Sequence, residues 1–156
     1  MGLMTMLGGL FGACGVVVGV VALGASAPAQ AGGVVLGAQV PADTVETLKE
    51  RNLLKPGESL LAYHDATVRL DMSEVTFVTP SRVVHARGES AAAMALVDVT
   101  EIKHHSEGLL GDVVELTSND DRKLRIEIAP LNGGDSYVSV LETAWQKHHP
   151  AAHVTR

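Results

Sequence analysis

The sequence predicts a mainly β domain. We expect a curved antiparallel barrel of about six or seven strands capped by a C-terminal α-helix, after a short helix and an apolar N-terminal helix. Three observations predict it. No charged residue precedes Asp43, the middle of the chain alternates apolar and polar side chains with the two-residue period of strands, and one helical apolar stripe lies near the end.

The N-terminal segment is long and apolar enough to cross a bilayer. Residues 3–23 carry no charge, and a helix rising about 1.5 Å per residue would cover a hydrocarbon core of roughly 30 Å over that length. We therefore assign residues 1–24 to a transmembrane helix. Four glycines share one face of it and predict close helix packing and self-association: Gly8, Gly12, Gly15 and Gly19.

A cleaved signal sequence is the alternative for this segment. Ala29-Gln30-Ala31 has the small-x-small form of a cleavage site, and release after Ala31 would give a periplasmic or secreted domain. A signal sequence normally begins with positive residues, which are missing here, so the pattern favours an uncleaved single-pass anchor. The nearest positive side chains lie after the run, beginning at Lys49, and this bias favours a cytoplasmic soluble domain.

The next elements follow from local signals. Residues 25–42 are rich in Ala, Gly and Pro and predict a linker. Asp43 can cap a short helix over residues 44–53, with Glu46 completing a capping box, before Pro56-Gly57. Strand patterns follow. They lie at 60–63, 68–72, 75–77, 82–86, 95–102, 112–117 and 123–128, with a hairpin turn at Thr79-Pro80-Ser81.

The final element is predicted to be an amphipathic helix. Asp135 can cap it, and residues 136–148 place Val138, Leu141 and Trp145 on one stripe. Such a stripe can plug the open end of a curved sheet. We expect residues 149–156 to form a disordered tail.

These segments resemble bacterial PH-like domains of the bPH and GRAM-like kind. The resemblance rests on residues 56–63 (PGESLLAY), on Thr79 and Arg82 of a T-x-x-R hairpin, on residues 96–102, and on the closing helix. It covers residues 43–148 and implies two near-orthogonal sheets capped by a C-terminal helix. The resemblance implies no single function, because PH-like folds bind lipid headgroups, peptides and proteins.

The net charge and the sequence motifs limit the classes of function that this chain can have. The net charge of −6 disfavours nucleic acid as a partner, and the acidic loop Asp71–Glu74 disfavours a phosphate headgroup. Cys14 is the only cysteine, which excludes an intramolecular disulfide and a Cys-based metal site. The sequence shows no nucleophile–base spacing, nucleotide loop or metal motif. We expect neither cofactor nor metal and interpret the histidine pairs as incidental.

The hairpin residues Thr79 and Arg82 have two interpretations. Arg82 can contact a ligand, or its guanidinium can lock the turn by bonding carbonyls or a carboxylate; we favour the structural role for both residues. The function predicted is a membrane-tethered, non-catalytic module that binds a protein partner or a membrane component. A hydrolase with a dispersed site is the lesser alternative.

Overall fold

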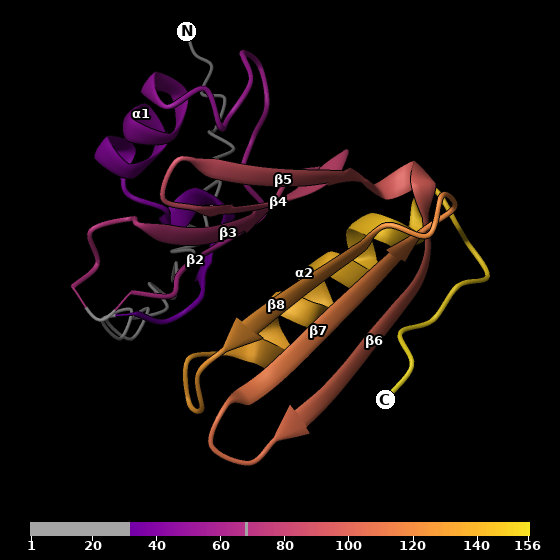
Figure 1. The fold of residues 1–156 in the computed structure, drawn as a ribbon. Helices are drawn as coiled ribbons and strands as arrows, with labels where there is room; N and C mark the ends of the chain where they lie inside the picture. Colours follow the sequence, from indigo (N-terminus) through magenta and orange to yellow (C-terminus); the bar gives the residue numbers. More distant parts are fainter. Residues whose placement is uncertain (1–31, 68) are drawn as a thin grey trace, which may run out of the picture.

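Two antiparallel sheets and two helices make up the part of the chain described by the computed structural model, residues 32–67 and 69–156 (Figure 1). The first sheet has five strands in the order β1-β2-β3-β4-β5 and the second has three in the order β6-β7-β8. The strands are β1 (Val35–Leu36), β2 (Ala62–Asp65), β3 (Glu74–Val78), β4 (Arg82–Arg87), β5 (Ser90–Ala95), β6 (Val99–Glu107), β7 (Gly111–Ser118) and β8 (Lys123–Ile128).

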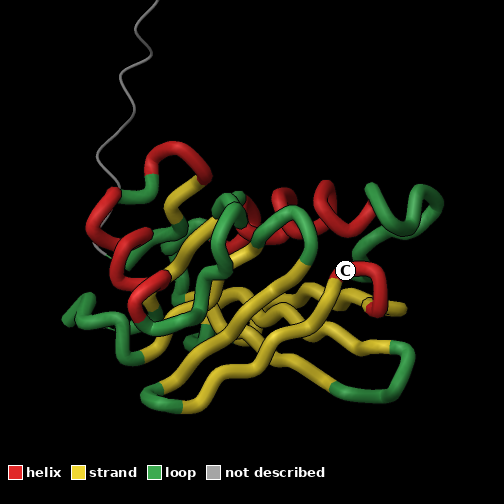
Figure 2. The backbone as a smooth tube through the Cα atoms, turned by 90° about the horizontal axis from the view of Figure 1, so that it is seen from above, coloured by secondary structure: helices red, strands yellow, loops and turns green. Residues whose placement is uncertain are grey.

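The helices cover different parts of these sheets. α1 (Ala42–Glu50) packs on the five-stranded sheet, and α2 (Gly134–Gln146) follows β8. α2 lies behind the three-stranded sheet in Figure 1 and runs along one side of the strands in Figure 2. Two short 3₁₀ turns, η1 (Gly37–Gln39) and η2 (Leu96–Asp98), complete the elements, and η2 links the sheets.

The main core lies between the two sheets and α2. Val78 and Val83 of the five-stranded sheet meet Ile102 and Leu116 of the three-stranded sheet, and Leu141 of α2 closes the cluster. All five side chains are buried. The amphipathic stripe predicted near the C-terminus therefore forms, and it is buried because it fills the space between the sheets.

A second core lies on the opposite face of the five-stranded sheet. Phe77 and Val84 project there, and Leu48 of α1 and Leu54 cover them. β2 and β3 are consequently buried on both faces, which explains why their alternation in the sequence is weak. The hairpin predicted around Thr79-Pro80-Ser81 is confirmed, because β3 and β4 pair from Val78↔Val83 onward.

Several predictions about elements are wrong. The segment 69–72 forms a loop, not the expected strand, because Leu70 and Met72 have φ of 53° and 58°, outside the β region. The carboxylate of Asp65 holds this loop by accepting the backbone N–H groups of Thr67 and Met72, each at 2.9 Å. β5 was not predicted, and η2 interrupts the strand expected at residues 95–102.

The helix caps and the sheet closure also differ from expectation. Asp43 and Asp135 lie in the first turns of α1 and α2, and the N-cap residues are Pro41 and Gly133. The structure has eight strands where about six or seven were expected. No ladder joins the two sheets in the described part of the chain, so the expected barrel is observed only as two open sheets.

Candidate functional site

Four strands form the margins of the two sheets. β1 and β5 border the five-stranded sheet, and β6 and β8 border the three-stranded sheet. A marginal strand carries unpaired N–H and C=O groups that can pair with another chain, and proteins usually protect such edges with charge, brevity or a covering segment. A margin without this protection is a candidate interaction site.

β8 is protected by charge. Lys123, Arg125 and Glu127 are exposed and alternate with buried apolar residues along the strand. Arg125 donates to the carboxylates of Glu115 and Glu107 at 3.1 and 3.0 Å. Charged side chains along an edge disfavour the docking of a second strand.

β6 is covered by the chain itself. The N–H of Thr155 donates to the carbonyl of Ile102 at 2.9 Å, and the N–H of His104 donates to the carbonyl of Thr155 at 2.8 Å. Val154 and Ala152 pack against the main core beside α2. The segment expected to be a disordered tail thus occupies the edge of β6, because its backbone and its small apolar side chains both find partners there.

β5 has none of these protections. Four consecutive residues from Ser90 to Ala93 are exposed, and the strand carries no charged side chain and no proline. β1, the other margin of this sheet, is only two residues long. Among the residues that the structure describes, β5 pairs with β4 alone. It is therefore the margin best suited to accept a strand.

The register shows which backbone groups of β5 are free. The N–H of Leu96 donates to the carbonyl of Ser81 at 2.8 Å, and the ladder runs from Arg82↔Ala95 to Arg87↔Ser90. Because backbone groups alternate in direction along an antiparallel strand, the even-numbered residues of β5 bond to β4. The N–H and C=O groups of Ala91 and Ala93 and the N–H of Ala95 consequently point away from β4, whereas the C=O of Ala95 lies at the N-cap of η2.

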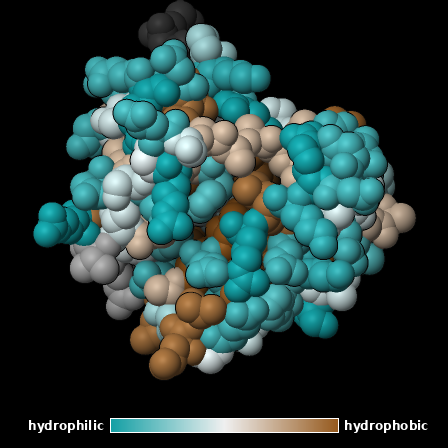
Figure 3. All heavy atoms as spheres, in the orientation of Figure 1, coloured by the Kyte–Doolittle hydropathy of each residue, from teal (hydrophilic) through white to brown (hydrophobic). Residues whose placement is uncertain are grey.

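A hollow lies beside this strand. It has a volume of about 150 Å³ and is lined by Ala92, Ala93 and Met94 of β5 and by Arg122, Lys123 and Leu124 at the start of β8. Figure 3 shows a moderately hydrophobic ridge at the place of β5 and apolar atoms in the depression below it. The alanine side chains are small enough to let another backbone approach, and the hollow offers room for one side chain of a partner.

The motif residues Thr79 and Arg82 contact the protein itself. The hydroxyl of Thr79 accepts the N–H groups of Ser81 and Arg82 at 3.3 and 3.2 Å, which caps the turn. The guanidinium of Arg82 binds both carboxylate oxygens of Glu58, at 2.8 and 2.6 Å, and donates to the carbonyl of Leu53 at 2.8 Å. Arg82 therefore ties the β3–β4 hairpin to the segment that follows α1.

Electrostatics at this pair follow from the contacts. The side chains of Arg82 and Glu58 are only 13% and 14% exposed. The hydrogen bonds from Arg82 favour the charged form and hold the pKa of Glu58 below its usual value, against the opposing effect of burial. The sequence did not reveal Glu58 as the partner, because 24 residues separate the two positions.

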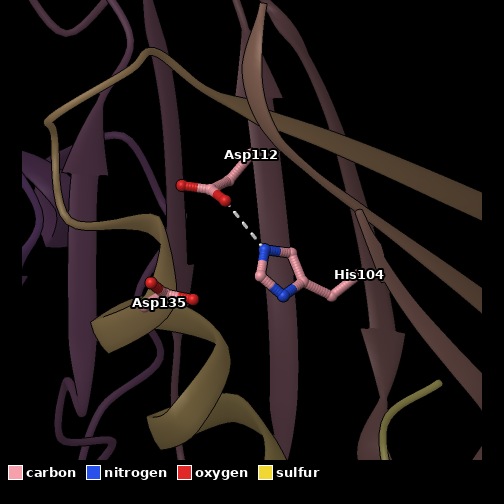
Figure 4. Close-up of side chains that lie close together, drawn as sticks. All are labelled: His104, Asp112 and Asp135. Atoms are coloured by element: carbon pink, nitrogen blue, oxygen red, sulfur yellow. Dashed lines mark hydrogen bonds and ion pairs between the residues drawn. The ribbon is translucent and has the colours of Figure 1, made fainter. Parts of the chain in front are cut away.

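Three side chains from different elements could hold a metal ion. His104 of β6, Asp112 of β7 and Asp135 of α2 place one ligand atom each within 4.8 Å of one another (Figure 4). The ring Nε2 of His104 and the Oδ1 of Asp112 are 2.9 Å apart, a hydrogen bond that accounts for both groups without an ion. Asp112 also lies against Gly134, where a Cβ would fall 2.1 Å from its Oδ2. The cluster thus links both strands to the start of α2.

Of the loop considered for headgroup binding, Asp71–Glu74, the first three residues lie between β2 and β3, and Glu74 begins β3. The carboxylate of Asp71 accepts the N–H of Ser73 at 3.0 Å, and hydrogen bonds from Ser73 lower its pKa. Asp71 is therefore ionised at neutral pH. Its negative charge would repel a phosphate group, in agreement with the sequence argument.

The predicted glycine stripe, Gly8, Gly12, Gly15 and Gly19, and the cleavage site at Ala31 lie outside the described residues. None of the described helices is both long and apolar enough to span a membrane. Comparison with protein-family models gives no match, and comparison with curated proteins gives no significant similarity.

Proposed function

We propose that this protein is a membrane-tethered, non-catalytic module that binds a protein partner by strand addition to β5. One observation carries the proposal: β5 is an edge strand with exposed, uncharged side chains, whereas β8 is charged and β6 is covered. Strand addition is a common mode of peptide recognition, in which backbone hydrogen bonds supply affinity and side-chain pockets supply specificity.

The residues at the free edge of β5 indicate what kind of partner segment could bind there. Ala91 and Ala93 offer outward-pointing N–H and C=O groups to an extended strand, and Ala95 offers its N–H. The hollow beside Met94 accepts one small or medium apolar side chain, and the neighbouring Lys123 favours an acidic residue next to it, since Arg122 is already paired with Asp120.

The order of elements supports the PH-like assignment proposed for residues 43–148. Four antiparallel strands, β2 to β5, are followed by three, β6 to β8, and then by the helix α2 that packs between the sheets. This order of strands, with a helix at the end, agrees with the order that the resemblance implies. Because such folds serve many functions, the functional proposal depends on the edge of β5 and not on the fold.

The tether is proposed from the uncharged run of residues 3–23. Membrane fractionation followed by N-terminal sequencing tests it. Recovery of the intact N-terminus from carbonate-washed membranes would support the anchor. A mature chain that begins at Gly32 in a soluble fraction would instead establish the released periplasmic or secreted domain.

Substitution of Ala93 tests the β5 site directly. Ala93→Pro removes an N–H that points to the free edge and keeps the ladder to β4, since proline is tolerated on edge strands where the N–H faces solvent. Ala93→Thr is the matched control, because it retains the N–H and favours a strand. The three intact chains would be used to capture proteins from solubilised membranes, after circular dichroism has shown equal folding.

We expect a partner that the unaltered chain and Ala93→Thr retain and that Ala93→Pro loses by about tenfold, the effect of leaving a partner carbonyl unpaired. Hydrogen–deuterium exchange should then show protection of the Ala91, Ala93 and Ala95 amides when the partner is added. Identical capture by all three chains, or protection elsewhere than β5, would refute the site.

A further inference from the structure

Three exposed leucines lie at one end of the three-stranded sheet. Leu109 and Leu110 form the β6–β7 turn, and Leu131 lies in the loop between β8 and α2. Their exposed fractions are 97%, 47% and 92%. A hydrophobic patch in the lower left of Figure 3 lies where Figure 1 shows this turn and this loop. Exposed apolar patches of this kind mark binding surfaces in soluble domains.

The turn and the loop are neighbours. At Gly111, with φ of 86°, a Cβ would lie 2.3 Å from the carbonyl oxygen of Ile128 and 2.6 Å from the nitrogen of Pro130. The end of the β6–β7 turn therefore packs directly on the chain just before Leu131. The three leucines therefore lie on one surface, which we call the leucine tip, although they come from two different connections.

The N-terminal segment joins the domain at the same tip. The N–H of Val34 donates to the carbonyl of Asn132 at 2.7 Å, immediately after Leu131. Gly32 also approaches Asn132 and the partly exposed Leu70. Eight residues separate Gly32 from the end of the apolar run at Leu23, and a chain of that length reaches at most about 30 Å. A domain tethered through this run keeps the leucine tip close to the bilayer.

The charges near the tip are mostly paired with other side chains. Glu107 accepts one hydrogen bond from Arg125 and lies 2.7 Å from the ring of His105, and Asp112 is hydrogen-bonded to His104. The carboxylate of Asp135 is exposed. The tip therefore offers leucine side chains and no cluster of positive charge, a surface suited to the hydrocarbon and interfacial region and not to anionic headgroups.

We propose that the tip formed by Leu109, Leu110 and Leu131 inserts into the bilayer surface and sets the orientation of the domain on the membrane. This inference rests on the tether of the proposed function. With the tip in the lipid, the end of β6 at Glu107 lies near the membrane, and its start at Val99, at the other end of this nine-residue strand, lies farther out. The η2 end of the three-stranded sheet therefore faces the aqueous phase.

Site-specific fluorescence tests the orientation on the full chain. In a Cys14→Ser background, the substitutions Leu109→Cys, Leu131→Cys and Val97→Cys each give one site for an NBD label. Val97 is the matched control, because it is also an exposed apolar residue (58%) and lies beyond the opposite end of β6. The labelled chains would be reconstituted into phosphatidylcholine vesicles containing lipids with a nitroxide quencher near the headgroup.

We expect labels at 109 and 131 to emit at shorter wavelength and to be quenched by the nitroxide lipid, and the label at 97 to behave as in water. Replacing both Leu109 and Leu110 by Gln should reduce the quenching at 131 severalfold, whereas Val97→Gln should leave it unchanged. Water-like emission at all three positions from chains that remain bound to vesicles would overturn the insertion and leave the tether standing. Chains that do not associate with vesicles would overturn both.

Discussion

Removal of the Arg82 guanidinium tests the central structural contact of the hairpin. Arg82→Ala eliminates two hydrogen bonds to Glu58 and one to the carbonyl of Leu53. Breaking a buried ion pair on one side costs about 3–5 kcal/mol, because the remaining charge is left without a partner. Glu58 is 14% exposed beside Arg82 and gains exposure when the guanidinium is removed, so water compensates in part, and we expect a loss of about 3 kcal/mol in the free energy of unfolding.

The assay is urea unfolding of the full chain in detergent, followed by the fluorescence of Trp145, the only tryptophan. A loss of about 3 kcal/mol corresponds to a fall of roughly 10 °C in the melting temperature for a domain of this size. Arg87→Ala is the matched control on the same strand. Arg87 is 78% exposed and lies 3.4 Å from Glu74, so its removal should cost less than about 1 kcal/mol.

The pH dependence of the free energy of unfolding distinguishes the contribution of the ion pair from that of side-chain packing. The pKa of Glu58 is lowered in the folded protein, so the unfolded state binds the proton more readily and the stabilisation is present above the unfolded pKa of about 4.5. It is lost as the pH falls through the lower folded value. Glu58→Gln should remove this part of the acid sensitivity. Equal stability of Arg82→Ala and Arg87→Ala, or an unchanged acid profile in Glu58→Gln, would refute the reasoning.

Three further outcomes are expected. Burial lowers the pKa of His64, whose Nδ1 has no hydrogen-bond partner among the described residues, so stability should decline as the pH falls below about 6.5. Urea titrations of His64→Leu should show a flatter profile in that range. Gly111→Ala should cost at least about 2 kcal/mol, since its Cβ would clash with the backbone at Ile128; an unchanged melting temperature would contradict this. Trp145→Phe leaves the carbonyl of Val99 unpaired and should cost about 1–3 kcal/mol in thermal unfolding, whereas no change would show that water replaces the indole.

Elements with a strong local period were predicted well. β8 shows why: Leu124, Ile126 and Ile128 face the core, and the residues between them face solvent. The α2 stripe is equally clear, because a helix with one buried face must repeat its apolar residues every three or four positions. In both cases one face of the element is buried, and this produces a repeat of apolar residues that can be read from a short stretch of sequence.

Elements without such a period were missed or misplaced. β5 is a run of alanines on an exposed margin, so neither face imposes an alternation. The segment 69–72 alternates like a strand, but the Asp65 carboxylate holds its backbone in a loop. The turn residues Gly88 and Glu89 after β4 were a signal that a further strand could follow.

Composition and periodicity by themselves determined that this protein has an uncharged apolar start, a β-rich acidic body and a closing amphipathic helix. Only the tertiary structure decided that Glu58 meets Arg82, that Thr155 covers β6, that β5 stays open and that the leucines gather where the chain enters the domain. The physical reason is the separation along the sequence of the residues that interact. Burial on one face is recorded in neighbouring residues, whereas contacts between distant residues depend on the path of the whole chain.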